Sequence, residues 1–187
     1  MSTPCAEPLS LAILIAYWLG ELEAETERQT EEHFFACASC GENLEALAAL
    51  AGGIRAAFHA GMVTAVISPA FLARMKERGM RVREYSVAPG GRVNCTVTAQ
   101  DDVLLGRLKA SLSEASRIDL LHMDEGGNLL RRYSDVPFDA AAGEVLLCPP
   151  TALLRMMPAA RDTVRLLAVS AEGERILGEY VFEHAPS

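Results

Sequence analysis

Basic residues are few in this sequence: 17 Lys and Arg stand against 25 Asp and Glu, which gives a net charge of -8. Proteins that bind DNA or RNA directly use Lys and Arg to neutralise phosphates. This balance therefore argues against direct nucleic-acid binding. A basic protein is the more plausible partner for an acidic chain of this kind.

Long hydrophobic runs and export signals are also missing. The most apolar run, residues 9–19, is about half the length that a membrane-spanning helix needs, and Ser10 interrupts it. The first residues contain no basic stretch and carry an early acid, Glu7, unlike a secretory signal. We therefore expect a soluble, cytoplasmic protein that does not insert into a membrane.

Cysteine is scarce, with five in the chain and one close pair, Cys37 and Cys40. An odd number without an export signal favours a reducing compartment, where a CxxC pair indicates metal or redox chemistry and not a disulfide framework. The sequence also lacks a nucleophile elbow, a P-loop and a dinucleotide fingerprint. Accordingly, we expect a protein that binds and does not catalyse.

Residues 33–40 contain three potential metal ligands, one histidine and two cysteines. His33, Cys37 and Cys40 would lie on one face of a helix. Imidazole nitrogen and thiolate sulfur are ligands that zinc prefers, and a structural zinc site needs four of them. We expect Cys5 to supply the fourth. Two alternatives stay open: a dithiol redox pair, or a helix end that carries two cysteines without a metal.

The first 79 residues favour helices. A strongly apolar helix ends near Gly20, an acidic second helix starts near Glu21 and closes with His33 and Cys37, and an amphipathic third helix covers 42–59. A fourth helix runs from the Ser68-Pro69 cap to Gly79. The first helix is apolar on nearly all sides, so it should be buried in its own domain or by a partner.

After residue 79 the sequence alternates between apolar and polar residues and is punctuated by turn residues. Short strands at this density indicate an antiparallel β-sandwich. Residues 149–157 would form a crossover between its sheets. The fold class is therefore α+β, with a helical zinc domain over 1–79 and a β-sandwich over 80–187. The expected strands are 80–87, 93–97, 103–108, 117–123, 129–133, 144–148, 163–169 and 175–182.

Residues 1–60 resemble the zinc-binding anti-sigma domain of bacterial anti-sigma factors. The resemblance rests on the motif His33-x3-Cys37-x2-Cys40. Residues 17–22 are similar to the tyrosine-leucine-aspartate-glycine-glutamate-leucine helix end of that family. An acidic second helix between these two segments is also typical.

The resemblance implies a function and a ligand set. Zinc would be held by His33, Cys37, Cys40 and one N-terminal residue, which by position is Cys5. The helical domain would bind an extracytoplasmic-function (ECF) sigma factor and keep it from RNA polymerase core. Some anti-sigma factors carry a C-terminal sensing domain, and the β domain is a candidate for one, with an unknown ligand.

Other interpretations stay open beside this one. A second metal site could use His122, His184, Cys95 and Cys148, although their spacing favours core cysteines and exposed histidines. The zinc domain could instead be a thiol-redox sensor. It could also be a scaffold for another protein, with the β domain doing the binding.

Overall fold

The computed structural model describes residues 5–186 and divides the chain into two compact units. The first ends at Ala56 and the second begins at Ala57. The boundary predicted after residue 79 therefore lies inside the second unit. The reason is that the short segment after the third helix packs on the β-sheets, as described below.

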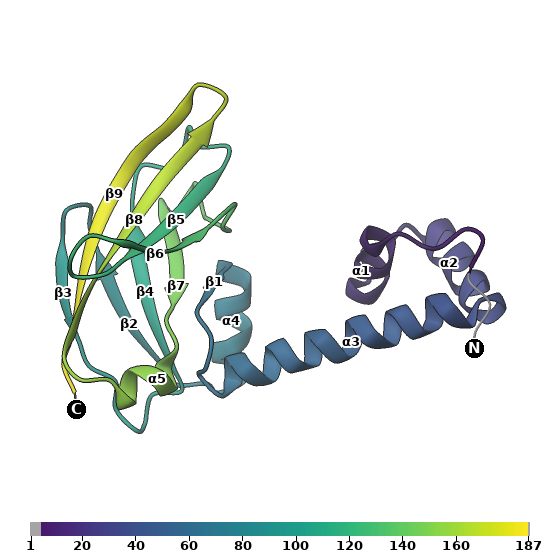
Figure 1. Ribbon diagram of the computed structural model, residues 1–187, viewed down its shortest axis with the longest axis horizontal. Coiled ribbons are helices and arrows are strands. Elements are labelled where there is room, and N and C mark those ends of the chain that lie inside the picture. Colours follow the sequence, from purple (N-terminus) through teal and green to yellow (C-terminus); the bar gives the residue numbers. More distant parts are fainter. Residues whose placement is uncertain (1–4, 187) are drawn as a thin grey trace. The chain divides into compact units, whose positions relative to one another are not determined.

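The first unit contains α1 (Leu11–Leu19), α2 (Ala24–Ala36) and most of α3 (Ala38–His59), whose last three residues belong to the second unit (Figure 1). The Ser10 hydroxyl caps α1 by accepting a hydrogen bond from the Ile13 amide at 3.3 Å. Gly20 ends α1 in the left-handed conformation, at φ 71°, where a side chain would be strained. The apolar helix α1 therefore begins after its N-cap, Ser10, and ends at its C-cap, Gly20.

The second and third helices are separated by one residue, Cys37. This residue has extended dihedrals, φ -131° and ψ 98°, and its carbonyl accepts from the Gly41 amide. The second helix thus ends close to the predicted position, and the three side chains do not lie along one continuous helix. The chain turns at Cys37, so that His33 ends one helix and Cys40 begins the next.

Few side chains are buried in the first unit. Among its described residues only Leu14, Thr30 and Cys40 are buried. Tyr17 and Phe34 pack edge to face with ring centroids 5.1 Å apart. The core of this unit is therefore small, and α1 buries a single side chain within it.

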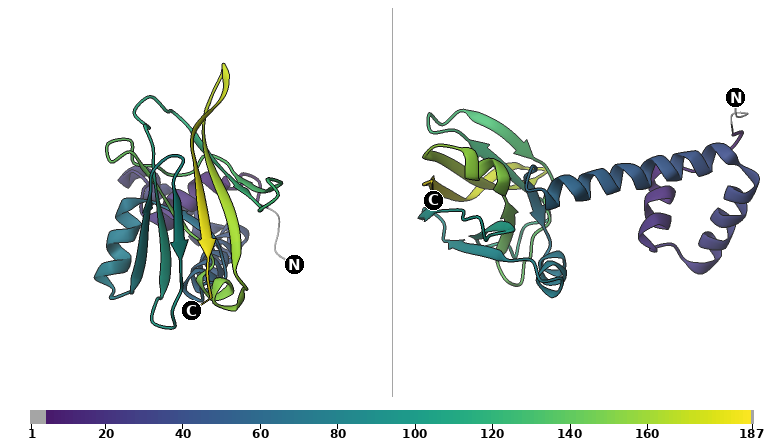
Figure 2. Two further views of the ribbon diagram at one scale, coloured as in Figure 1. Left: turned by 90° about the vertical axis from the view of Figure 1, so that its left-hand side faces the viewer. Right: turned by 90° about the horizontal axis from the view of Figure 1, so that it is seen from below.

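The second unit contains two β-sheets with short helices (Figures 1 and 2). One sheet has the order β1-β7-β4-β2 and the other β3-β9-β8-β5-β6. Eight of the nine strands coincide with predicted ones, and the three-residue β1 was not predicted. The strands are β1 (Ala65–Ile67), β2 (Val82–Val87), β3 (Arg92–Cys95), β4 (Val103–Lys109), β5 (Ile118–Met123), β6 (Leu129–Tyr133), β7 (Glu144–Cys148), β8 (Ala160–Ser170) and β9 (Gly173–His184).

The prediction of an antiparallel sandwich holds only loosely. β2 pairs with β4 and β3 pairs with β9 in parallel, while the other pairs are antiparallel. The turn after β2 resembles a hairpin in sequence but sends β3 to the other sheet. β2 and β3 therefore do not pair with each other, and each pairs in parallel with a later strand of its own sheet.

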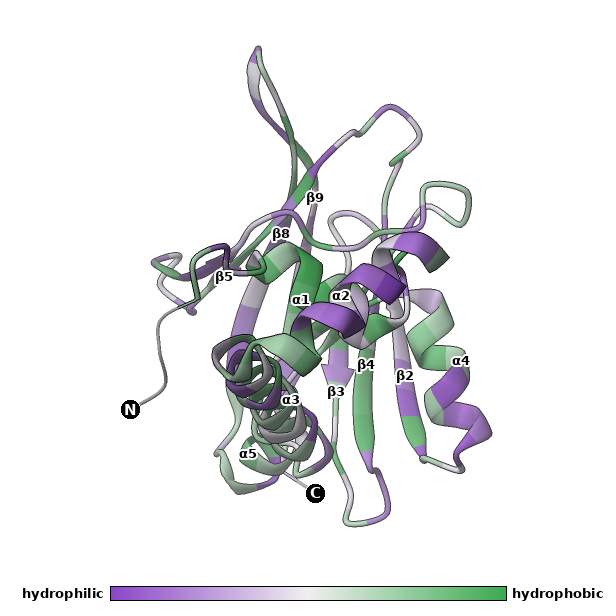
Figure 3. Ribbon diagram, turned by 90° about the vertical axis from the view of Figure 1, so that its right-hand side faces the viewer, coloured by the Kyte–Doolittle hydropathy of each residue, from purple (hydrophilic) through white to green (hydrophobic). Residues whose placement is uncertain are grey.

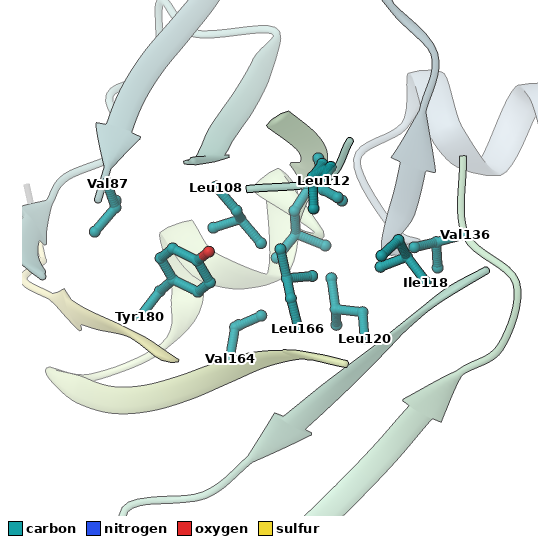
Figure 4. Close-up of a cluster of buried hydrophobic side chains, with 11 residues drawn as sticks. Val87, Leu108, Leu112, Ile118, Leu120, Val136, Val164, Leu166 and Tyr180 are labelled. Carbon is teal, nitrogen blue, oxygen red and sulfur yellow. The ribbon is translucent and has the colours of Figure 1, made fainter. Parts of the chain in front are cut away.

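The main core lies between the two sheets (Figure 4). Leu108 and Val145 come from one sheet, and Leu120 and Leu166 come from the other. Tyr180 of β9 is fully buried and donates a hydrogen bond across the core to the Lys109 carbonyl at 2.7 Å. Face-to-face packing of this kind gives the second unit an extensive core of its own.

A second cluster covers the outer face of the first sheet. Leu72 and Met75 of α4 (Pro69–Glu77) pack against Ile67, Leu105 and Leu146 of the sheet. This packing places β1 and α4 in the second unit. The predicted crossover is also present: α5 (Thr151–Met156) connects β7 in one sheet to β8 in the other.

A buried carboxylate stabilises the edge of the second sheet. Asp119 is fully buried and accepts hydrogen bonds from Arg117, Arg132 and the Asp135 amide. Burial alone would raise the pKa of its carboxyl, but these donors outweigh burial and lower the pKa to about 2. The carboxylate is therefore charged and fully partnered in the folded protein.

Candidate metal centre

The predicted ligands come from four places in the first unit. Cys5 lies ahead of α1, and His33 lies in the last turn of α2. Cys37 separates α2 from α3, and Cys40 is in the first turn of α3. The site therefore connects the segment before α1 with the junction of the other two helices.

The ligand atoms of these four residues lie within 4.8 Å of one another. His33 Nε2 is 3.2 Å from Cys40 Sγ and 3.6 Å from Cys5 Sγ. In a tetrahedral zinc site with ordinary bond lengths, ligand atoms are separated by about 3.6–3.8 Å. The arrangement is therefore compact enough for one metal ion to contact all four atoms. Its donor set of one imidazole and three thiols suits a soft or borderline metal.

The start of α3 favours the anionic form of Cys37. Hydrogen bonds from the Cys40 backbone amide and the Cys5 thiol lower the pKa of the Cys37 thiol. Burial and the hydrogen bond to Cys37 raise the pKa of the Cys5 thiol. The thiolate form is thus favoured at Cys37, and the Cys40 side chain is fully buried. Metal ligation requires this kind of deprotonated sulfur.

The structure thus brings together all four residues named from the sequence, including Cys5, which is 28 positions from His33. Within residues 5–186 this is the one group of three or more His, Cys, Asp or Glu side chains close enough to hold a metal ion. No helix in that range is both long enough and apolar enough to cross a membrane.

The other four candidate residues do not come together as one metal-binding group. Cys95, His122 and His184 line a pocket in the second unit, whereas Cys148 belongs to the cluster beneath α4. The two histidines were expected at the surface, but His184 is buried. No sequence signal marked it, because its burial depends on the position of β9 between β3 and β8.

Comparisons with known proteins give a weak likeness. No family model matches the chain, and no curated protein matches it. Among solved structures, the N-terminal domain of phage TP901-1 ORF48 matches with a TM-score of 0.38 and 11% identity, covering 58% of this chain and 99% of that one. CopC from Methylosinus trichosporium OB3b matches with a TM-score of 0.28 and 14% identity, covering 66% and 95%. At these scores neither likeness bears on function.

Proposed function

We propose that this protein is a zinc-containing anti-sigma factor that binds an ECF-type sigma factor through its helical unit. The proposal combines the His33-x3-Cys37-x2-Cys40 motif with a surface in the same unit suited to a protein partner. It assigns no catalytic step. The metal acts by holding the binding surface in shape.

Zinc is the metal that the ligands favour. Three thiols and one imidazole with a small, compact geometry match structural zinc sites, which use four protein ligands. A unit with three buried residues has little hydrophobic stabilisation of its own. Zinc binding would therefore supply much of its folding free energy.

The observation that carries the proposal is the apolar surface left exposed by the first unit. On α1, Leu11 is 63% exposed and Leu19 is 52% exposed, although the helix is strongly hydrophobic (Figure 3). On α3, Leu50 and Ile54 are 62% and 59% exposed. Exposed apolar side chains gathered on two helices of one small unit indicate a protein-binding surface.

The acidic helix α2 supports a basic partner. Glu25, Glu27, Glu31 and Glu32 are all exposed, and Arg28 is the sole basic residue of the helix besides His33. Arg28 pairs with Glu25 and Glu32, which leaves the helix with an excess of negative charge. A sigma factor presents basic surface to DNA, so this charge would favour rapid association more than tight binding.

The test is co-purification with the ECF sigma factor encoded nearest to this gene, using zinc-loaded protein. We expect a stable complex and a loss of sigma-dependent transcription in vitro when the protein is added. Ile54→Asp should weaken the complex at least tenfold because it puts a charge into the apolar surface. Ile176→Asp is the matched control, since Ile176 of β9 is 57% exposed and lies outside the helical unit.

Absence of a complex with zinc-loaded protein would overturn the proposal. Equal weakening by Ile54→Asp and Ile176→Asp would overturn the assignment of the surface to the helical unit. In either case the metal content is measured first, so that a failure to bind metal is distinguished from a failure to bind the partner.

A second function is favoured by the accessibility of Cys37, which is only half-buried whereas Cys40 is buried. In this version the site is a thiol-redox sensor. One hydrogen peroxide molecule would accept two electrons from the Cys37 and Cys40 thiolates and two protons from solvent, forming a disulfide and two water molecules, with release of zinc. Metal content before and after peroxide treatment tests it, and unchanged zinc would exclude it.

A further inference from the structure

A pocket lies between the two sheets of the second unit. It has a volume of about 230 Å³, and its walls are mainly apolar side chains from both sheets. Leu104 of β4 lies on one side, and Leu120, Val164 and Phe182 come from the other sheet. For comparison, an apolar cavity of about 150 Å³ binds benzene. This pocket has room for a somewhat larger molecule.

A buried imidazole lacks any partner at this pocket. His184 is 6% exposed, and neither Nδ1 nor Nε2 has a hydrogen-bond partner in the described part of the chain. His184 lies near the end of β9, opposite Cys95 of β3 in the sheet register. Leaving a buried polar group unpaired costs free energy, which a ligand with a complementary group would recover.

The remaining polar groups of the pocket decide the charge of such a ligand. Asp162 Oδ1 lies 3.6 Å from His122 Nε2, too far for a hydrogen bond, and both side chains are about one-third exposed, so water can reach them. The Asp162 carboxylate would repel an anion, and the apolar walls disfavour any charge. A neutral imidazole offers one donor and one acceptor, which suits a hydroxyl or carbonyl group.

We propose that this pocket binds a small, uncharged and mostly apolar molecule whose single hydroxyl or carbonyl group hydrogen-bonds to His184. An apolar cavity with a few convergent polar groups is the usual form of a small-molecule site. Leu130 of β6 and Met157 after α5 line the pocket and are 56% and 39% exposed, so the pocket opens to solvent beside them. The inference is independent of the proposed binding of a sigma factor.

The experiment is calorimetric titration of the full-length protein with 1-octanol, an uncharged chain with one hydroxyl group, and with octanoate, its anionic counterpart. We expect saturable binding of 1-octanol and at least tenfold weaker binding of octanoate. His184→Phe should reduce the affinity for 1-octanol about tenfold, because a single hydrogen bond is lost while the apolar contact remains. Thermal unfolding verifies that this variant is folded.

A matched pair of variants tests the opening of the pocket. Leu130→Trp places a large side chain at the opening and should abolish binding. Leu129→Trp alters the neighbouring residue of the same strand, which is 57% exposed and does not line the pocket, and should leave binding intact. The proposal is overturned if 1-octanol does not bind, if octanoate binds as tightly, if His184→Phe binds unchanged, or if the two tryptophan variants behave alike.

Discussion

The two units of this protein differ in where their stabilisation comes from. The first has three buried residues among those described, one of which is the metal-ligand candidate Cys40. The second has an extensive core between two sheets, another cluster under α4, and a buried carboxylate with three donors. The second unit therefore has a large core of its own, whereas the first has little buried apolar surface to stabilise it.

The two units also differ in the balance of exposed and buried apolar side chains. The second unit exposes some large ones, such as Leu130 and Ile176, but buries many others, such as Leu105 and Leu166. The first unit leaves Leu11, Leu50 and Ile54 largely exposed. If a metal ion binds Cys5, His33, Cys37 and Cys40, four side chains would hold the three helices together without a large apolar core.

The largest expected effect comes from removing the metal. A strong zinc chelator should unfold the first unit and leave the second folded, because the metal contributes on the order of 10 kcal/mol at such sites. Trp18 of α1 is the single tryptophan of the chain, so its fluorescence reports on the first unit alone. Far-UV circular dichroism should show loss of helix with retention of the β signal.

Cys40→Ala and Cys148→Ala form the matched pair for that experiment, since both remove a buried thiol. Cys40→Ala should lose the metal and the folded state of the first unit. Cys148→Ala should retain the metal and lower only the stability of the second unit. A chelated protein with unchanged Trp18 fluorescence and unchanged helix content would contradict the comparison.

The next effect concerns the buried carboxylate. Asp119→Ala leaves Arg117 and Arg132 without their shared partner, and should lower the free energy of unfolding of the second unit by about 3 kcal/mol. Urea unfolding followed by far-UV circular dichroism measures it. Glu172→Ala, at an exposed turn, should change stability by less than about 0.5 kcal/mol. Metal content should be the same in both variants.

Acid should weaken the second unit through the same residue. The pKa of Asp119 is lowered from 3.8 to about 2 in the folded protein, so its contribution is complete above pH 3.8 and is lost as the pH falls toward 2. The loss should reach about 2 kcal/mol. Urea unfolding measured across this range should show a flatter pH dependence for Asp119→Asn. An equally steep dependence in that variant would assign the effect to other carboxylates.

The smallest effect compares two helix caps of the same chemistry. Ser10 and Ser68 each accept a hydrogen bond from the amide three residues later. Replacing either with Ala should cost about 1 kcal/mol. Ser68→Ala should lower the free energy of unfolding of the second unit with or without metal. Ser10→Ala should lower that of the first unit only in the metal-loaded protein, because the unit is unfolded without metal. Threonine at either position keeps the oxygen and should restore most of the loss.

Sequence reasoning located the candidate centre because ligand chemistry requires particular residue types. Imidazole and thiol side chains at short spacing have few other uses together, so His33, Cys37 and Cys40 could be named directly. The helix end near Cys37 was also predicted, whereas the start of the next helix at Ala38, four residues before the predicted Glu42, was not. The ligands converge through two helices and not along one.

The positions of most strands in the second unit could be predicted from the sequence, but the way the strands pair could not. Alternation of apolar and polar residues identified β2 and β3, and the sandwich was expected to be antiparallel throughout. Whether two neighbouring strands pair depends on which sheet buries more apolar surface, and that is a property of the whole unit. For the same reason β1, with three residues, and the buried state of His184 gave no local signal.

The position of β9 has a consequence for synthesis on the ribosome. This strand lies between β3 and β8, and β3 has no other partner in its sheet. The second sheet therefore stays incomplete until β9 has left the exit tunnel. The helices with the cysteines emerge much earlier and can acquire their ion while the rest is still being translated. The helical unit of a nascent chain could in this way fold before the larger unit is complete.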